Sequence, residues 1–272
     1  MVKDLKQRLT LGSVLVTTVV ALFVIDRDYF PAAAAVFTLL SLAAQQEFYS
    51  MLASDSNPGR KIWGGVMGAV ILGGAWFAPE LRFEMLFACV VVYLIFEVLS
   101  SQVENAAKRL AATLLPLLVV PLLLSYALLI RNVDPHGWGW MMMLVVACKA
   151  GDSSAYLVGS AIGKHKLIPK VSPNKSWEGA IASVLGAIIG AYCVARFAFD
   201  GELSTLMWLG AALVTNVGAQ FGDLAESLLK RGCNSKDSAS IIPAFGGTFD
   251  MVDSFLIAAP CLYFFLLITG VA

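Results

Sequence analysis

The sequence predicts an all-α, polytopic integral membrane protein with about nine transmembrane helices and a cytoplasmic N-terminus. Of its 272 residues, 58% are hydrophobic and only 14% are charged, whereas a soluble domain carries about 25% charged residues. The mean hydropathy is +0.78, so the chain has more apolar surface than one soluble core can bury, and a bilayer is the expected solvent. The formal net charge is zero, which argues against a nucleic-acid partner.

The apolar residues gather in runs long enough to cross a bilayer, which takes about 20 mostly apolar residues. The nine runs are expected at about 9–25, 30–50, 62–78, 83–100, 110–130, 138–160, 177–198, 203–222 and 254–271. The first run follows a basic start, as in a signal peptide, but it lacks a clear small-residue cleavage site and eight runs follow it, so we expect a helix there. With no internal repeat, we expect one membrane domain over 1–272, with an N-terminal helical part at about 1–135 and a catalytic half at about 136–272.

The basic residues set the expected orientation, because cytoplasmic segments of membrane proteins are enriched in lysine and arginine. With the N-terminus inside and the helices alternating, most of the 19 lysines and arginines fall on the cytoplasmic side. The two longest inner segments are then 161–176 and 223–253, while outer connections such as 26–28 and 200–202 are short. We therefore expect the protein to work at the cytoplasmic surface.

Six charged residues fall within or beside the apolar runs, where a charge is costly and is usually functional or paired. They are Glu47, Glu97, Lys149, Asp152, Asp223 and Glu226. Lys149 and Asp152 lie three residues apart, so they share a helical face and can pair. A structural ion pair and a functional site both stay open for them. Glu47 and Glu97 lie near the inner ends of their helices, where water can reach them.

The segment GDLAESLLKR, at 222–231, has helical periodicity in its polar residues. At positions i, i+4, i+7 and i+8 of one face it carries Asp223, Ser227, Lys230 and Arg231. Such a face suits a metal-bound phosphate, because the carboxylate can hold the metal while the cations hold phosphate oxygens. For Lys230 and Arg231 alone, ordinary basic residues of a cytoplasmic loop are the simpler interpretation.

Two glycines and two aspartates follow this segment. Gly246 and Gly247 allow close backbone approach. Asp250 and Asp253 are three residues apart and share one helical face. Paired carboxylates that face phosphate-binding cations are what a Mg²⁺-dependent phosphoryl or nucleotidyl transfer requires. A solvated loop is the alternative, and it explains the carboxylates poorly because the positive-inside rule does not call for them.

The other long inner segment reads GKHKLIPKVSPNKSWEG, at 163–179, and contains four lysines. Ser176 is placed to cap the following helix, and Glu178 would interact favourably with the helix dipole at that N-terminus. A basic strap over an anionic substrate is an equally good interpretation of the lysines.

Residues of the C-terminal half also keep a fixed spacing: Ser227, Lys230-Arg231, Lys236-Asp237, Gly246-Gly247, Asp250 and Asp253. The segments GDLAES at 222–227, SPNKSWEG at 172–179 and DSSAYLVGSAIGKHK at 152–166 accompany them. Together these motifs resemble the signature of the CTP-dependent phosphatidate cytidylyltransferases, also called CDP-diacylglycerol synthases. The N-terminal half resembles that family only as a run of helices.

Three residues depart from the family's pattern, all close to the glycine pair. Ala244 and Phe245 stand where the family has glycine and histidine, and Met251 stands where an arginine follows the first aspartate of the last pair. The aspartates, the Lys-Asp pair and the glycine pair are retained. The sequence therefore predicts an intact metal site and leaves open how the three changes affect substrate binding or rate.

The resemblance implies transfer of a cytidylyl group from CTP to phosphatidate, giving CDP-diacylglycerol and pyrophosphate in phospholipid biosynthesis. The expected catalytic residues are Asp223, Lys236, Asp237, Asp250 and Asp253. The expected substrate-binding residues are Ser172, Lys175, Ser227, Lys230, Arg231, Gly246, Gly247 and Asp152. Mg²⁺ is the expected cofactor, bound by Asp223, Asp250 and Asp253, and a second cation is left open.

The expected partners are CTP, phosphatidate or a similar lipid phosphate, and membrane lipids, and the resemblance also suggests a homodimer. The expected location is a bacterial inner membrane, with the active site facing the cytoplasm. The alternatives are a polyprenol kinase, a cytidylyltransferase for another lipid phosphate, and a catalytically impaired homologue. Lys149 and Asp152 would suit a transporter, but transporters often contain inverted repeats, and none is visible in the sequence.

Overall fold

The computed structural model describes residues 32–52, 60–235 and 247–272, and these ranges are mostly helical. The helices in chain order are α2 (Ala32–Leu52), α3 (Lys61–Phe77), the short 3₁₀ helix η1 (Pro79–Leu81), α4 (Arg82–Ser100), α5 (Ala106–Val119), α6 (Pro121–Arg131), α7 (Gly137–Ile162), α8 (Trp177–Ala198), α9 (Thr205–Gly232) and α10 (Thr248–Ile268). A hairpin of two strands, β1 (Lys166–Ile168) and β2 (Ser172–Ser176), joins α7 to α8. The expected helix at 9–25 lies outside the described residues.

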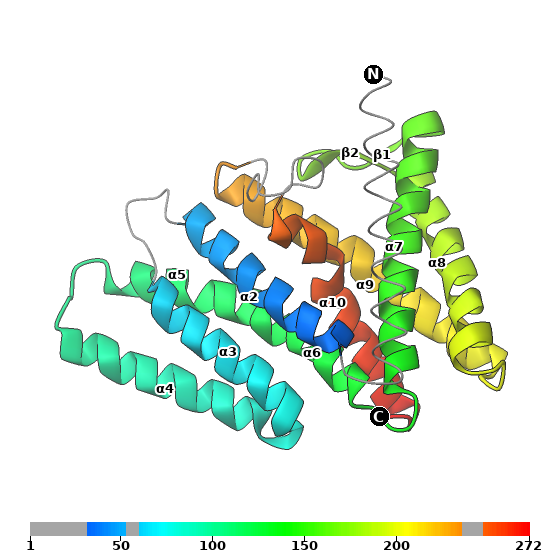
Figure 1. The fold of residues 1–272 in the computed structure, drawn as a ribbon. Helices are drawn as coiled ribbons and strands as arrows, with labels where there is room; N and C mark the ends of the chain where they lie inside the picture. The colour runs from blue at the N-terminus through cyan, green and yellow to red at the C-terminus, as the bar shows by residue number, and fades with distance from the viewer. Residues whose placement is uncertain (1–31, 53–59, 236–246) are drawn as a thin grey trace.

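The helices form a bundle with two different flanks (Figure 1). α7 and α8 lie side by side along one flank, and α3 and α4 make up the other, with α2, α6, α9 and α10 between them. Small residues allow the closest contacts, as expected for helices that pack in a membrane. A side chain added at Gly218 of α9, for example, would meet the backbone of Ala258 in α10. The α9–α10 pair is therefore close-packed next to the segment that carries the sequence motifs.

The helices are those of a membrane protein in length and in surface. Within the described residues, five are long and apolar enough to span a bilayer, namely Pro79–Ser100, Ala106–Arg131, Gly137–Ile162, Trp177–Ala198 and Thr248–Ile268. Large apolar side chains point outward, including Ile62, Phe77 and Ile189, which are 83%, 84% and 66% exposed. Such a surface suits lipid rather than water. The total of nine spans stays a prediction.

One expected run is divided in the structure. The sequence predicted one helix over 110–130, but α5 ends at Val119 and α6 begins at Pro121. Pro121 has no backbone N–H to continue the hydrogen-bond ladder, and it begins the next helix. Together the two helices still form one apolar stretch that is long enough to cross a bilayer.

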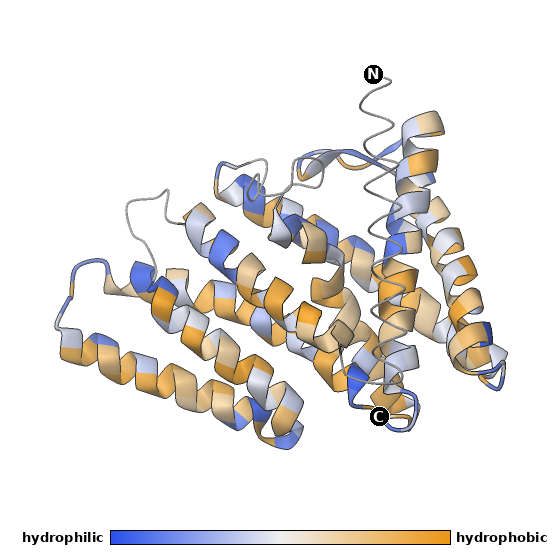
Figure 2. Ribbon diagram, viewed as in Figure 1, coloured by the Kyte–Doolittle hydropathy of each residue, from blue (hydrophilic) through white to orange (hydrophobic). Residues whose placement is uncertain are grey.

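Polar residues collect at one end of the bundle, at the hairpin and the adjoining ends of α9 and α10 (Figure 2). The described residues at this end form more secondary structure than the sequence predicted. The segment 161–176 contains the antiparallel hairpin, in which Lys166 pairs with Ser176 and Ile168 with Ser172. The segment 223–253 is helical at both ends, because α9 continues to Gly232 and α10 begins at Thr248.

Glu97, one of the charges at membrane depth, is buried in a closed network between α4, α5 and the start of α3. Arg60 Nε lies 2.9 Å from its Oε1, and Arg109 Nη2 lies 2.8 Å from its Oε2. The Tyr93 hydroxyl also donates to Oε1, at 3.1 Å. Glu97 is only 8% exposed, so its charge is neutralised by protein groups, and it holds together helices on the flank away from the sequence motifs.

Candidate active site

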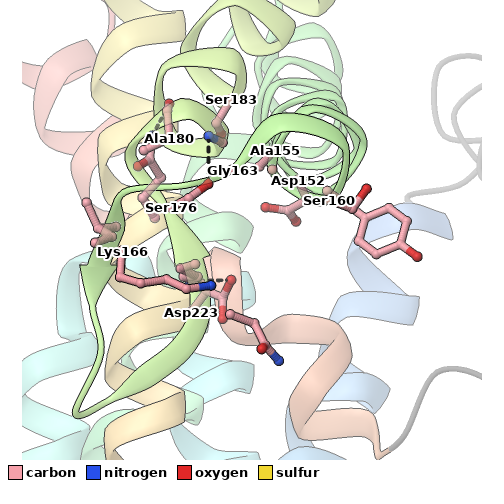
Figure 3. A pocket seen from close by; sticks show the side chains of 16 residues that line it. Asp152, Ala155, Ser160, Gly163, Lys166, Ser176, Ala180, Ser183 and Asp223 are labelled. Carbon is pink, nitrogen blue, oxygen red and sulfur yellow. Dashed lines mark hydrogen bonds and ion pairs between the residues drawn. The ribbon is translucent and has the colours of Figure 1, made fainter.

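A cavity of about 600 Å³ lies at the polar end of the bundle, between α7, the hairpin, α8 and α9. Figure 3 shows Asp152 and Ser160 of α7, Ser176 at the end of the hairpin, and Asp223 of α9 around it. Lys166, Lys175, Ser183 and Gln220 also line it. Its walls combine carboxylates, lysines and apolar groups, so the cavity can accept a ligand that is both charged and partly apolar.

The hairpin carries a lysine into this cavity. Lys175 lies on β2, and its Nζ is 2.6 Å from Asp223 Oδ2. The strand reaches the cavity because Ser176 ends it and caps α8, accepting a hydrogen bond from Gly179 N at 3.2 Å. The predicted cap at Ser176 is therefore confirmed. Lys175 and Asp223 bring together the two sequence segments that the family resemblance had linked only by motif.

Three carboxylates meet at the junction of α9 and α10. One oxygen from each of Asp223, Glu226 and Asp253 lies within 4.8 Å of the others. Asp223 and Glu226 share a face of α9 because they are three residues apart. Gly222, beside them, lets the α10 backbone at Asp253 approach, since a side chain there would collide with the Asp253 carbonyl.

Glu226 is the buried member of this acidic group. It is 1% exposed, and Lys230 Nζ lies 2.7 Å from its Oε1. Glu226 lies beyond the apolar part of α9. Burial raises the pKa of its carboxyl group to about 9. The interaction with Asp250 adds to this rise, and Lys230 opposes it. Burial thus disfavours the charged form of the Glu226 carboxyl group. A cation bound at the group would relieve that energetic cost.

The acidic group therefore fits a divalent ion. All its donors are carboxylate oxygens, which are the ligands that Mg²⁺ prefers in proteins, and the three come from two rigid helices. The sequence had placed Asp223 and Asp253 in such a set, and the structure brings these two together. Sequence analysis noted Glu226 only as a charge at depth, although its i+3 spacing from Asp223 would have been the signal for the pair.

Asp250 takes a different position from the one expected beside Asp253. Its Oδ1 is 2.7 Å from Lys230 Nζ, and its Oδ2 accepts a hydrogen bond from Gly247 N at 2.8 Å. It thus caps the N-terminus of α10 and forms an ion pair with Lys230. Its assignment as a metal ligand stays a prediction, because the acidic group contains Glu226 in its place.

Glu47 of α2 holds the start of α10 from the other side. Its Oε1 accepts from Thr248 N at 2.6 Å and its Oε2 from Phe249 N at 2.9 Å. These N–H groups have no partner within the helix, and a carboxylate there also interacts favourably with the helix dipole. Glu47 is 6% exposed. Glu47 therefore positions the helix that carries Asp250 and Asp253.

Lys149 connects α7 to α10 beside the cavity. Its Nζ lies 3.3 Å from Asp152 Oδ2, which confirms the predicted pair, and it donates to Ser254 Oγ at 3.0 Å. It also donates to the carbonyl of Met251 at 3.3 Å. The backbone carbonyl of Met251 thus helps to hold Lys149, although the Met251 side chain departs from the family pattern.

The remaining predicted residues are placed as follows. Ser172 lies on β2, Ser227 is half-buried on α9 and Arg231 is exposed near the end of α9. None of these three is among the described residues that line the cavity. Gly247 is the residue before α10. Lys236, Asp237 and Gly246 lie outside the described residues, as do Ala244 and Phe245.

Comparison with known proteins identifies the family of this chain. The family described as "Cytidylyltransferase family" matches residues 6–269. The chain belongs to the cytidylyltransferase family.

Similar individual proteins carry one name, phosphatidate cytidylyltransferase. The protein from Bacillus subtilis (strain 168) is 39% identical over 141 residues, covering 52% of each chain. The protein from Haemophilus influenzae is 38% identical over 141 residues, covering 49% of each. The protein from Mycobacterium bovis is 32% identical over 157 residues, covering 57% of this chain and 50% of that one. The chain thus spans about half the length of the curated relatives it matches.

Proposed function

We propose that this protein transfers the cytidylyl group of CTP to phosphatidate, releasing pyrophosphate. The observation that carries the proposal is the acidic group of Asp223, Glu226 and Asp253 beside a lysine-lined cavity, at the polar end of an apolar bundle. A water-soluble nucleotide and a bilayer-embedded lipid phosphate can meet at such a place. Membership of the cytidylyltransferase family and the name of the similar proteins support the same reaction.

The reaction needs charge neutralisation and alignment rather than a protein nucleophile. An ionised oxygen of the lipid phosphate attacks the α-phosphorus of CTP, and the bond from that phosphorus to the oxygen bridging it to the β-phosphorus breaks. The electron pair of that bond leaves with pyrophosphate, so no proton has to be removed from the attacking group. Holding two anions in line is therefore the main task of the site.

The residues of the acidic group and the two lysines can divide this task. Asp223, Glu226 and Asp253 would hold Mg²⁺, which supplies positive charge at the phosphate oxygens when bound. Lys175 would exchange its contact with Asp223 for a phosphate oxygen. Lys230, fixed between Glu226 and Asp250, would contribute a nearby positive charge. A second cation stays a prediction.

We further propose that the active site faces the cytoplasm of a bacterial inner membrane, with nine spans and an N-terminus on the same side. The clustering of polar residues at the end with the hairpin and the acidic group supports this orientation (Figure 2), as does the preference of lysine and arginine for cytoplasmic segments. The similar proteins come from bacteria. The structure contains one chain, so the homodimer stays a prediction.

Pyrophosphate release by the detergent-purified protein tests the reaction. Release that requires CTP, phosphatidate and Mg²⁺ together is expected, and Asp253→Asn should abolish it while leaving the protein folded. Asp200→Asn, at an exposed turn away from the cavity, is the matched control and should keep full activity. Release of CDP in place of pyrophosphate would identify a lipid kinase and overturn the proposal, as would full turnover by the Asp253 variant.

A further inference from the structure

A chain of hydrogen-bonded side chains crosses from α9 to α8 at the wall of the cavity. Asn216 Nδ2 donates to Ser183 Oγ at 2.8 Å and to the Ser183 carbonyl at 3.3 Å. Gln220 Nε2 donates to Asn216 Oδ1 at 2.8 Å and to the Ala180 carbonyl at 3.3 Å. Asn216 and Ser183 are 1% and 2% exposed, and Gln220 and Ser183 line the cavity. The protein therefore presents two polar groups to a ligand from a buried support.

The partners of these amides fix which way each one points. A side-chain amide has two N–H donors on nitrogen and an acceptor oxygen. If the Gln220 amide were turned over, its oxygen would face Asn216 Oδ1 and the Ala180 carbonyl, both acceptors, and a buried acceptor without a donor is costly. Both donors of Gln220 are thus used inside the protein. Its Oε1 accepts no hydrogen bond from any described residue and is available to a ligand.

The hydrogen bond from Asn216 also determines how the Ser183 hydroxyl can bind a ligand. Because Ser183 Oγ accepts from Asn216, its own hydrogen is free to donate. The cavity wall consequently offers a fixed acceptor at Gln220 next to a donor at Ser183. The helix opposite makes room for this arrangement, since a side chain added at Gly151 would lie 2.5 Å from Asn216 Nδ2 and 2.9 Å from Ser183 Oγ.

The two proposed substrates differ in how well they match this pattern. The glycerol esters of a lipid phosphate have acceptors only, so they leave the Gln220 oxygen without a donor. Cytosine carries an amino group, a donor, next to the ring nitrogen N3, an acceptor. Uracil presents the reverse, a carbonyl oxygen beside a ring N–H. The Gln220 oxygen matches the cytosine amino group and opposes the uracil carbonyl, and the Ser183 hydroxyl can donate to N3 of cytosine.

We propose that Gln220 and Ser183 recognise the base of the nucleotide and select CTP over UTP. Gln220 would accept from the cytosine amino group, and Ser183 would donate to N3. Asn216 is a positioning residue, because it holds both groups in the orientation that favours cytosine. This inference rests on the proposed function, since it assumes that the cavity takes a nucleoside triphosphate.

The ratio of kcat/KM for CTP to that for UTP tests the proposal, measured by pyrophosphate release with phosphatidate and Mg²⁺. The unaltered protein should strongly prefer CTP. Gln220→Met and Ser183→Ala should each lower kcat/KM for CTP by roughly 10- to 100-fold, since a bound donor or acceptor loses its partner, with little change for UTP. Gln46→Met, at an exposed position on α2, is the matched control and should leave the ratio unchanged.

Two results would overturn the proposal. An unchanged CTP-to-UTP ratio in folded Gln220→Met and Ser183→Ala variants would show that the base is recognised elsewhere. An equal loss with both nucleotides would mean that these side chains meet a group that CTP and UTP share, such as a ribose hydroxyl. If Gln220→Met fails to fold, Ser183→Ala decides alone, because alanine fits wherever serine does.

Binding measurements separate this inference from the proposed reaction. Titration calorimetry with CTP and with UTP, in the presence of Mg²⁺, gives the selectivity without turnover. Selective CTP binding that Gln220→Met abolishes, in a protein that releases no pyrophosphate, would sink the proposed reaction and support the base-recognition role. Equal binding of CTP and UTP by the unaltered protein would overturn the role even if pyrophosphate is released.

Discussion

Two regions of the bundle hold carboxylates among apolar helices, and they are built in opposite ways. In the first, Glu97 accepts from two guanidinium groups, those of Arg60 and Arg109, and from the Tyr93 hydroxyl. In the second, five carboxyl groups lie around the cavity and its acidic group, while three lysines contact them. The carboxyl groups are Asp152, Asp223, Glu226, Asp250 and Asp253, and the lysines are Lys149, Lys175 and Lys230.

The charges are arranged differently around Glu97 and around Asp223. Around Glu97 the protein supplies more positive than negative charge, and the groups are closed off by α4 and α5. Around Asp223 the described carboxyl groups are crowded together beside an open cavity. A buried charge is costly unless it is paired, and Asp223, Glu226 and Asp253 concentrate three carboxyl groups in one place. A divalent cation and the phosphates that it binds would complete this second region.

The Glu97 network should give the largest effect on stability. Glu97→Gln leaves two arginines without their counter-charge, and breaking a buried ion pair costs about 3–5 kcal/mol. We expect that loss in the free energy of unfolding, measured by denaturant titration in mixed micelles. Glu84→Gln, at an exposed position on the same helix, should cost little. A Glu97 variant of full stability would show that this network does not hold the flank together.

The residues at the cavity should change activity more than stability. Lys175→Met removes a cation that is proposed to move from Asp223 to a phosphate, and we expect kcat/KM to fall by roughly 10- to 100-fold, about the contribution of one charge-assisted hydrogen bond. Lys170→Met changes an exposed lysine in the turn of the same hairpin and should have no such effect. Equal losses in the two variants would mean that the hairpin acts only by its overall charge.

Replacing Glu47 should affect both stability and activity, each by a smaller amount. Glu47→Ala removes the acceptor of two N–H groups at the start of α10, and loss of a helix cap costs about 0.5–2 kcal/mol. Because α10 carries Asp253, a modest fall in turnover should accompany the loss of stability. Gln46→Ala, at the exposed neighbouring position, controls for the substitution on α2. A large loss of turnover at full stability would instead make Glu47 part of the site.

Local periodicity explains what the sequence could predict. The face shared by Asp223, Ser227 and Lys230 lies on α9 as expected, because helical spacing depends only on neighbours along the chain. The cap at Ser176 and the pair of Lys149 with Asp152 are likewise local, and both are confirmed. Each of these features involves residues no more than seven apart and needs no knowledge of the tertiary fold.

Tertiary packing explains what the sequence could not predict. Which aspartate of α10 joins Asp223 depends on how α10 lies on α9 at Gly222, and this contact brings in Asp253 and leaves Asp250 with Lys230. The cap that Glu47 provides acts between residues about two hundred positions apart. Spacing along the chain carries no information about either contact.

Binding of Mn²⁺, a paramagnetic substitute for Mg²⁺, tests the central claim most directly. The binding is measured by electron paramagnetic resonance titration of the detergent-purified protein. We predict that the unaltered protein and Asp200→Asn bind Mn²⁺ saturably and that Mg²⁺ competes with it. Asp253→Asn should lose this binding. This result would show that the carboxyl groups of Asp223, Glu226 and Asp253 serve to hold a divalent ion. Unchanged Mn²⁺ binding by a folded Asp253→Asn variant would contradict the account.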